Sequence, residues 1–457
     1  MAPGNSRPHE QAPAEPPAPA LLTDLYELTM AASYFSHGMG GEATFELFAR
    51  ELPEGRNFLV ACGTEDAADY LAGFAFQEDE IGYLRSLGMF DEQFLAYLAD
   101  FRFTGDLWAL PEGELFFDDE PVLRVIAPLI EAQMVETLLL NTVGFQSLVA
   151  SKAARVTIAC QGRPFADFSP RRDHGRDAAV KAAYASYAGG AAATSNVLAG
   201  QRYGLPLSGT MAHSYVMSFE RETEAFECFL ASYPRDTTLL IDTYDTIEGA
   251  RRAVKVMREM GDRVRARAVR IDSGDLAELS RAVRRVLDES GFPGVQIFVS
   301  GDLDEYRIAA LLEAGAPIDA FGVGTQLGTG GDVPSLGVVY KLVADEQGPK
   351  MKRSPGKATV PGAKQIYRFE EGGEIRRDVL ALADEPPPGG RPLLRRTVHR
   401  GQRVEPREPL ATARARALAG IESLPARLRA LEAAAEPYAI EQSPALRRVA
   451  EQLGLAG

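Results

Sequence analysis

Between residues 236 and 330, short apolar runs alternate with amphipathic segments, and this rhythm restricts the possible folds more than any other feature of the chain. Each run leads into a stretch with apolar residues at helical spacing, which indicates a strand followed by a helix. Gly261, Gly291 and Gly315 mark the ends of successive helices. Because each helical crossover returns the chain to the same edge, the pattern predicts a parallel sheet with strands at 238–241, 268–271, 295–299 and 319–323.

Carboxylates gather directly after these expected strands. Asp242, Asp272 and Asp302 stand 30 residues apart, at equivalent positions of consecutive strand and helix units. The carboxyl ends of parallel strands share one rim, and the active sites of α/β barrels occupy that rim. The spacing therefore predicts an acidic site on the rim of an α/β barrel.

A glycine-rich segment follows the last expected strand and comprises Gly322, Gly324, Thr325 and residues 328–331. Backbone N–H groups with no side chain in the way suit a phosphate, and barrels commonly bind phosphate on the loops after their late strands. The alternative is a flexible glycine loop. A dinucleotide fingerprint fails because Leu327 takes its third glycine position, and a kinase-type phosphate loop fails because Ala358 follows Lys357.

The rest of the chain has a mixed helical and extended character. A first helix is expected at 21–37, with Thr23 or Asp24 as its cap, and a long buried helix at 130–154. Extended segments broken at Pro121 are expected within 115–126. Further expected elements are strands at 42–49, 57–61, 365–369, 379–383 and 392–398, the last three antiparallel, and surface helices from residue 411 onward.

Composition excludes several classes of partner. The net charge of −15 repels nucleic-acid backbones, so nucleic acid is not expected to bind. The apolar stretches are far shorter than the roughly 20 residues of a membrane-spanning helix, so no membrane segment is expected. Cys62, Cys160 and Cys228 are widely spaced, which favours a reducing cytoplasm. Residues 1–20 lack the apolar core of a signal peptide and are expected to form a disordered tail.

Three further places carry candidate chemistry. His213 lies among small and hydroxyl residues, where it could act as base or nucleophile, although a lone histidine is more often structural. Arg171 and Arg172 can clamp a carboxylate or phosphate, or can form surface ion pairs instead. Tyr26 is either a core-facing helix aromatic or a residue that stacks on a flat ligand. His174, beside the arginines, is expected to cap a helix or to face solvent.

Seven strings that span nearly the whole chain resemble the nicotinate phosphoribosyltransferase family, whose members join nicotinic acid to the ribose of phosphoribosyl pyrophosphate in NAD synthesis. In chain order they are LLTDLYELTM (21–30), FSPRRDHG (168–175), SNVLAGQRYGLPLSGTMAHSYVMSF (195–219), LIDTYDT (240–246), RIDSGDL (270–276), FGVGTQLGTGGDVPSLGVVYKLV (321–343) and GKATVPGAKQIYRF (356–369).

The resemblance implies an α/β fold, namely an irregular α/β barrel of the type II phosphoribosyltransferase kind with a second, β-rich α+β domain. It also implies a homodimer with a shared active site, in which Tyr26 stacks on the pyridine ring held by the neighbouring chain. By the same resemblance His213 is phosphorylated by ATP, which couples ATP hydrolysis to nucleotide formation. The expected domains are the β-rich domain at 21–140 and 345–405, the barrel at 141–344 and C-terminal helices at 406–457.

A mechanism follows as a hypothesis. Arg171, alone or with Arg172, pairs with the anionic groups of nicotinate or of the phosphoribosyl donor. Asp242, Asp272 and Asp275 hold the ribose hydroxyls and Mg²⁺, directly or through water, because hard cations prefer oxygen ligands. Positioning of the two reactants then supplies most of the rate, with little proton transfer.

The remaining expected contacts complete the site. The 5′-phosphate is expected on Gly322, Gly324 and Thr325. His213 and Asp272 are the expected catalytic residues, and Asp272 and Asp275 the expected metal ligands. The other expected substrate contacts are Tyr26, Arg171, Thr210, Ser214, Asp242, Asp275, Ser300 and Gly301.

Three alternatives stay open at this point. A phosphoribosyltransferase for nicotinamide or quinolinate would share the barrel and the phosphate loop, although the arginine pair favours a single carboxylate. A barrel that has lost catalysis and only binds is a second alternative, since a fold does not fix a function. An aldolase-like lyase is disfavoured because residues 236–330 offer no clear strand-end lysine or metal cluster.

Overall fold

The computed structural model describes residues 19–352 and 359–454. Most of the tail expected at 1–20, together with Lys357 and Ala358, therefore lies outside the described residues. The described residues form two compact units. We call Lys152–Pro334 the α/β unit, and residues 19–151, 335–352 and 359–454 the β-rich unit. The division between them falls inside one helix, α6 (Glu136–Ala159). The four domain ranges expected from the sequence stay predictions.

The α/β unit is built on one parallel sheet of six strands in the order β7-β6-β11-β10-β9-β8. An isolated parallel bridge from Thr194 to Leu207 extends the sheet beyond β7. Among the described residues, no strand pairing closes the ring between Leu207 and β8. The strands are β6 (Phe165–Asp167), β7 (Ala193–Thr194), β8 (Arg235–Leu240), β9 (Arg265–Ile271), β10 (Gln296–Val299) and β11 (Ala320–Val323). The predicted α/β class, with an irregular barrel-like sheet, is confirmed.

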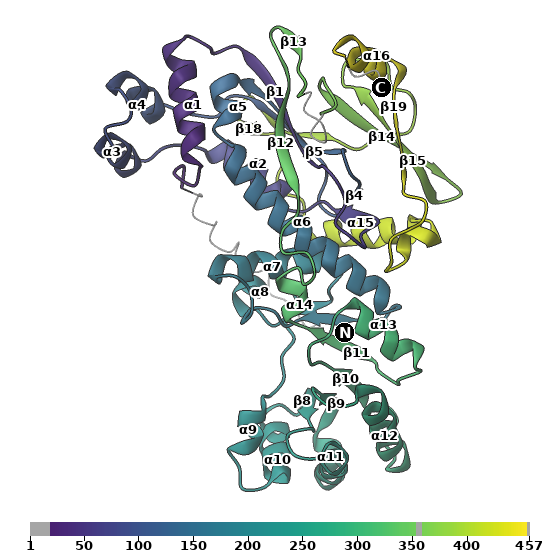
Figure 1. Cartoon of the computed structure of the whole chain (residues 1–457). Coiled ribbons are helices and arrows are strands. Elements are labelled where there is room, and N and C mark those ends of the chain that lie inside the picture. Colours follow the sequence, from purple (N-terminus) through teal and green to yellow (C-terminus); the bar gives the residue numbers. More distant parts are fainter. Residues whose placement is uncertain (1–18, 353–358, 455–457) are drawn as a thin grey trace. The chain divides into compact units, whose positions relative to one another are not determined.

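Three helices after the late strands begin in the same way. Asp245, Asp275 and Asp304 each accept hydrogen bonds from backbone N–H groups of the first helical turn. Such caps satisfy donors that the helix itself leaves free. Figure 1 shows these helices, α11 (Thr246–Met260), α12 (Leu276–Glu289) and α13 (Glu305–Glu313). The other helices of this unit are α7 (Arg176–Ala188), α8 (Val197–Tyr203), α9 (His213–Met217), α10 (Glu222–Ser232), η1 (Gly261–Arg263) and α14 (Thr325–Gly328).

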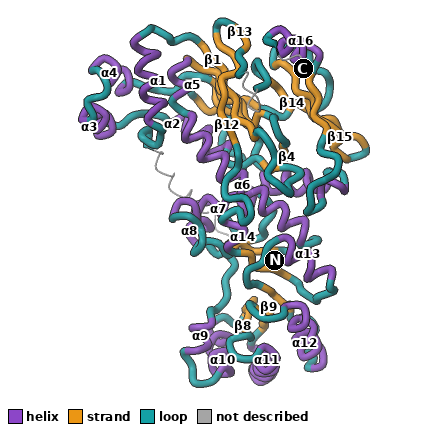
Figure 2. Tube along the Cα trace, viewed as in Figure 1, coloured by secondary structure: helices purple, strands orange, loops and turns teal. Residues whose placement is uncertain are grey.

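The β-rich unit contains most of the strands in the chain, as the orange segments in Figure 2 show. Its largest sheet has the order β13-β12-β1-β5-β3-β17-β18, and a second sheet has the order β16-β14-β15-β19. The strands are β1 (Glu42–Ala49), β2 (Leu59–Val60), β3 (Asp106–Ala109), β4 (Leu115–Phe116), β5 (Pro121–Pro128), β12 (Val338–Asp345), β13 (Gly348–Pro349), β14 (Lys364–Glu371), β15 (Glu374–Leu382), β16 (Arg391–Pro392), β17 (Arg395–His399), β18 (Gln402–Arg403) and β19 (Ala439–Gln442). The second, β-rich part of the predicted fold is confirmed.

The extended segments expected within 115–126 are the separate strands β4 and β5. Pro121 begins β5, because the first residue of a strand tolerates a missing N–H. Two other local predictions need correction. The long helix expected at 130–154 is two helices, since the backbone turns at Met134 between α5 (Leu129–Gln133) and α6. Asp24 is the residue before α1 (Leu25–Ser36), but its side chain makes no capping hydrogen bond to the helix. Its carboxylate accepts a hydrogen bond from the hydroxyl of Thr137 instead.

The helices of the β-rich unit flank its sheets. None of the helices among the described residues combines the length and the apolar character needed to cross a bilayer. Besides α1, α5 and the first part of α6, they are α2 (Thr64–Gly73), α3 (Glu78–Ser86), α4 (Glu92–Ala99), α15 (Leu410–Ser423), η2 (Ala426–Arg429) and α16 (Pro444–Gln452).

Candidate active site

His213 and Asp272 come together although 59 residues separate them. Asp272 directly follows β9, and His213 is the first residue of α9. The imidazole Nε2 lies 3.7 Å from a carboxylate oxygen of Asp272, and Nδ1 lies 3.2 Å from the hydroxyl of Thr243. His213 is 40% exposed and Asp272 28%, so both side chains can reach a ligand. The two residues predicted to be catalytic therefore lie side by side at the carboxyl ends of the strands.

Asp242 is the buried partner in this cluster. Its Oδ2 accepts hydrogen bonds from the backbone N–H of Asp272 and from the hydroxyl of Ser273, each at 2.8 Å. Its Oδ1 is buried and has no hydrogen-bond partner among the described residues. A buried carboxylate oxygen without a partner is costly unless a ligand or ion completes it. Asp242 thus offers one unused oxygen next to Asp272.

Arg270 organises the cluster, and the sequence analysis did not single it out. Its guanidinium donates to Asp272 at 2.7 Å, to the hydroxyl of Ser300 at 2.8 Å and to the hydroxyl of Thr210 at 2.8 Å. Ser300 in turn donates to Asp272. One side chain therefore connects the ends of β9 and β10 to the segment that leads into His213. The available signal was an arginine within the expected strand 268–271, two residues before a rim aspartate.

These contacts fix the charge of Asp272. Burial disfavours its ionised form, but the hydrogen bonds from Ser300 and Arg270 and the charge of Arg270 outweigh burial, so the pKa of Asp272 lies below its ordinary value. Asp272 is therefore an anion throughout the neutral range.

The predicted phosphate segment lies directly after β11. Gly322 is buried at the end of that strand, where a Cβ would lie 2.6 Å from the ring of Phe168. Gly324 and Thr325 form the turn into the short helix α14. On the neighbouring loop, Gly301 has a φ of +102°, and a Cβ there would overlap the backbone carbonyl of Asp272. The glycines at both turns are required by close packing, which brings bare backbone to the rim.

The loop after β6 carries the arginines. Arg171 and Arg172 are exposed, and neither guanidinium has a hydrogen-bond partner within the described chain. Asp173 packs against Gly328 and accepts a hydrogen bond from Ser169 at 3.1 Å. Burial and the nearby charge of Asp167 raise the pKa of Asp173 to about 7. The arginine loop and the glycine segment therefore touch through Asp173.

Other predicted residues have different contacts. Asp275 caps α12 through Oδ1, so this oxygen serves the helix, and its predicted role as a metal ligand stays a prediction. Asp302 shares the rim but accepts from Arg307 through its backbone carbonyl, and none of the described hydrogen bonds joins its carboxylate to Asp272. Ser214 is exposed on α9, beside His213. His174 is exposed on the arginine loop.

Tyr26 belongs to the β-rich unit, on α1, where its side chain is 46% exposed. Partial burial and the carboxylates of Glu136 and Glu27 raise the pKa of its hydroxyl, so the phenol stays neutral. An exposed, uncharged ring can stack on a flat ligand, and the predicted stacking role stays a prediction.

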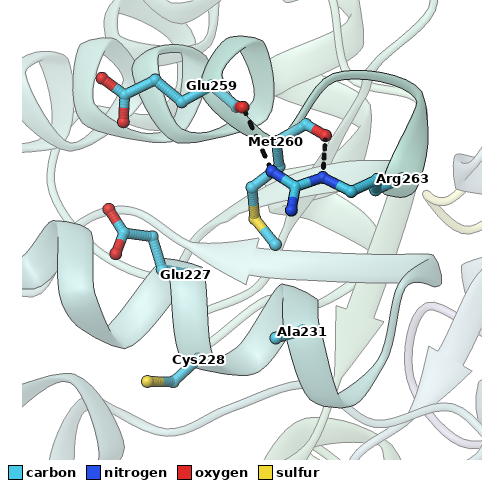
Figure 3. A pocket seen from close by; sticks show the side chains of 6 residues that line it. All are labelled: Glu227, Cys228, Ala231, Glu259, Met260 and Arg263. Carbon is cyan, nitrogen blue, oxygen red and sulfur yellow. Dashed lines mark hydrogen bonds between the residues drawn. The ribbon is translucent and has the colours of Figure 1, made fainter.

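A cavity of about 430 Å³ lies elsewhere, between α10, α11 and η1. Figure 3 shows Cys228 of α10 across from Met260, with Arg263 bonded to the backbone carbonyls of Met260 and Glu259. None of the predicted site residues lines this cavity. The rim cluster, rather than this cavity, holds the candidate chemistry.

A parallel α/β sheet with carboxylates, a histidine and tight glycine turns at the carboxyl ends of its strands is typical of enzymes of the α/β-barrel type. Comparisons with known proteins narrow this class. Residues 21–144 match the nicotinate phosphoribosyltransferase N-terminal domain, and residues 158–347 match the nicotinate phosphoribosyltransferase family. The chain belongs to the nicotinate phosphoribosyltransferase family.

Individual relatives agree with this assignment. A nicotinate phosphoribosyltransferase of Mycobacterium tuberculosis is 50% identical over 425 residues, which cover 93% of this chain and 91% of that protein. The enzyme of that name from Bacillus subtilis is 44% identical over 376 residues, covering 80% and 76%. The crystal structure of human nicotinic acid phosphoribosyltransferase matches with a TM-score of 0.83 at 30% identity, covering 94% of this chain and 99% of the human chain.

Proposed function

We propose that this protein transfers phosphoribose from phosphoribosyl pyrophosphate to nicotinate, giving nicotinate mononucleotide and pyrophosphate in NAD biosynthesis, with ATP as co-substrate. The observation that carries the proposal is the cluster of His213, Asp272, Asp242 and Arg270 at the strand ends, in a chain of this family. Neither nicotinamide nor quinolinate is favoured by the relatives named above. The unpaired thiols of the three cysteines support a cytoplasmic reaction.

The two glycine turns are proposed to bind the phosphorylated sugar. Gly322, Gly324 and Thr325 follow β11, and Ser300 with Gly301 follows the adjacent strand β10. Backbone N–H groups at such turns bind phosphate oxygens without the entropy cost of ordering long side chains. The sugar ring would then lie near Asp242 and Asp272, whose oxygens can accept from its hydroxyls.

Magnesium is proposed to be bound by Asp242 and Asp272. The buried and unpartnered Oδ1 of Asp242 suits a hard cation, as does the ionised Asp272. No group of three His, Cys, Asp or Glu side chains in the described part of the chain is close enough to hold a metal by itself. Oxygen atoms of the bound substrate would supply the remaining ligands of such an ion. When bound, Mg²⁺ would neutralise charge on the departing pyrophosphate.

Nicotinate is proposed to bind through its carboxylate to Arg171, because that guanidinium is exposed and has no hydrogen-bond partner in the described chain. In this proposal a second copy of the chain supplies Tyr26, so that the active enzyme is a homodimer. The pyridine nitrogen then attacks C1 of the ribose while the bond from C1 to pyrophosphate breaks. Both reactants are held in place, and positioning supplies most of the rate.

His213 is proposed to accept the γ-phosphoryl group of ATP, releasing ADP, with later hydrolysis of the phosphohistidine to phosphate. The hydroxyl of Thr243 engages Nδ1, which leaves Nε2 as the nucleophile on the side of Asp272. Phosphorylation adds roughly −1.5 to −2 charges at this point, by analogy with other phosphorylated side chains. That charge would lie beside Asp272 and alter how the pyrophosphate group is held.

The phosphoryl step can be tested with His213→Ala. We expect ADP formation in the presence of both substrates to be abolished, and acid-labile phosphate to be absent from the variant protein. His37→Ala is the matched control, because His37 is an exposed histidine at the end of α1 and bonds only to its own helix. Normal substrate-dependent ADP release from His213→Ala would show that His213 is not the phosphoryl acceptor.

A further inference from the structure

A buried lysine in the α/β unit bridges two rim loops that no sequence motif connects. The side chain of Lys152, on α6, is 3% exposed. Its Nζ contacts Glu305 at 2.8 Å and Asp332 at 2.9 Å. Glu305 begins α13, after the loop that follows β10, and Asp332 directly follows the glycine segment after β11. One ammonium group therefore contacts the segments that follow two adjacent strands, β10 and β11.

The contact between Lys152 and Glu305 is buried. Glu305 is fully buried and also accepts a hydrogen bond from Arg155 at 2.8 Å. Burial alone would raise the pKa of Glu305, but the charges and hydrogen bonds of Lys152 and Arg155 lower it below its ordinary value. The carboxylate is therefore ionised and held by two cations, as a buried charge must be to persist.

The loop between β10 and Glu305 is tied to the same helix. Asp304 caps α13 by accepting from the backbone N–H of Arg307 at 2.8 Å, and Arg307 donates to the backbone carbonyl of Asp302 at 2.7 Å. These bonds connect the first turn of α13 to the turn at Ser300 and Gly301. Fixing Glu305 against Lys152 therefore also fixes that turn.

The second contact of Lys152 lies at the end of the glycine segment. Asp332 is 43% exposed and contacts Lys152 directly. The adjacent Gly331 has a φ of +59°, and a Cβ there would lie 3.1 Å from the lysine Nζ. The backbone of this segment thus packs onto the ammonium group itself. The path through α6, α13 and α14 can be followed in Figure 1.

We propose that Lys152 is a positioning residue that holds the turn at Ser300 and Gly301 and the segment after Gly322 at the separation needed to bind one phosphorylated sugar. The inference rests on the function proposed above. Lys152 and Arg155 are balanced by Glu305 and Asp332, so the lysine charge is already matched within the protein. Its effect on the ligand is therefore geometric, through loops that need no rearrangement on binding.

Lys152→Met keeps an unbranched side chain, one atom shorter, and removes its charge. We expect the KM for phosphoribosyl pyrophosphate to rise about tenfold, with the KM for nicotinate changed less than about twofold. Asp332→Asn removes only the charge of the exposed partner of Lys152. The buried ion pair of Lys152 with Glu305 remains, so this variant should fold. It is expected to raise the same KM by a smaller factor. Binding of ribose 5-phosphate, measured by calorimetry, should weaken in parallel in both variants.

Arg252→Met is the matched control, because it removes a cation from another ion pair of the same unit, that between Arg252 and Glu222 at 2.7 Å. It is expected to lower the melting temperature without moving the KM for phosphoribosyl pyrophosphate. If Asp332→Asn and Lys152→Met keep the wild-type KM and the wild-type affinity for ribose 5-phosphate, the role proposed for Lys152 is contradicted. The proposed function of the protein would not be affected by that result. If the wild-type protein neither forms nicotinate mononucleotide nor binds ribose 5-phosphate, both the proposed function and the role of Lys152 would be contradicted.

Discussion

Asp173 shows how a single side chain can make the stability of this protein depend on pH. Its Oδ1 is buried without a hydrogen-bond partner in the described chain, and the pKa of the carboxyl is raised to about 7. The folded state therefore holds a proton that the unfolded state has released between about pH 4 and pH 7. Stability conferred by the neutral form is present below this window and is lost as the pH rises through it.

Asp173→Asn replaces the carboxyl group by an amide, so this position no longer binds or releases a proton. We expect the variant to gain melting temperature relative to the wild type as the pH rises from about 4 to about 7, with a constant difference above pH 7. Thermal unfolding followed at several pH values measures this. Asp177→Asn, at an exposed position on α7, is the control and should show no such trend. A difference that does not vary with pH would contradict the role given to Asp173.

Arg270 makes a second prediction at this scale. Its guanidinium uses three nitrogens on three acceptors, an arrangement that a single ammonium group cannot reproduce. Arg270→Lys is expected to lower kcat/KM by about 10- to 100-fold, the scale of one charge-assisted hydrogen bond of 1.5–3 kcal/mol. Arg267→Lys is the control on the same strand, because Arg267 is exposed and bonds only to Gln296. Equal steady-state kinetics of the two variants would contradict the role of Arg270.

The sequence predicted individual site residues unevenly. Asp242 and Asp272 were found because strand periodicity and 30-residue spacing place both at one edge, and the structure joins them. The contact of His213 with Asp272 could not be derived, because it depends on the path of a long connection across the rim. Arg270 was overlooked because a charge inside a strand pattern reads as an exposed position unless its partners are known.

Among the structural elements, the turns after β10 and β11 are the ones on which the proposed binding of the phosphorylated sugar depends. Gly301 takes a conformation that side chains other than glycine rarely adopt, and its backbone packs on the carbonyl of Asp272. Gly301→Ala is therefore expected to cost about 1–3 kcal/mol of unfolding free energy and to reduce activity more than stability alone explains.

The control for this change is Gly294→Ala, in the turn before β10, where a Cβ meets nothing within 4 Å. Denaturant unfolding and steady-state kinetics on both variants make the comparison. If Gly301→Ala is as stable and as active as Gly294→Ala, the loop is not constrained in the way described.

Elements with strong periodicity were predicted well, and those fixed by partners were not. The strand 42–49 matches β1 (Glu42–Ala49), and the four strands of the 236–330 rhythm match β8 to β11 within a few residues. The strand β12 was not predicted, although it pairs with β1 along seven residues, because its burial does not alternate from residue to residue. β19 was missed because a four-residue strand beside β15 has no periodicity of its own.

At the scale of the whole molecule, the β-rich unit is assembled from two separated stretches of chain, and a buried charge cluster joins them. Arg368, 2% exposed, contacts Asp378 and Glu114, and Tyr438 donates to Asp378. The charges of Asp378 and Glu114 outweigh burial and raise the pKa of Arg368, so it stays protonated. Hydrophobic patterning predicts the class of such a unit but cannot show which distant carboxylates meet one arginine.

Arg368→Met tests this cluster. Removing one partner from a buried network leaves uncompensated carboxylates, so we expect a loss of about 3–5 kcal/mol in the free energy of unfolding. Denaturant midpoints measure the loss. Arg376→Ala breaks only exposed pairs with Glu371 and Glu374 and should cost less than about 1 kcal/mol. A stability of Arg368→Met close to that of Arg376→Ala would mean that the cluster does not hold the two stretches together.

We propose above that the rim of the α/β unit joins phosphoribose to nicotinate. The most direct measurement is product formation by the purified protein with phosphoribosyl pyrophosphate, Mg²⁺ and ATP, offered nicotinate, nicotinamide or quinolinate in separate reactions. We expect nicotinate mononucleotide from nicotinate, with kcat/KM for the other two acceptors lower by at least about 100-fold, since a site built to pair one carboxylate rejects analogues strongly. Equal or faster turnover of nicotinamide or quinolinate, or no nucleotide from any acceptor, would contradict it.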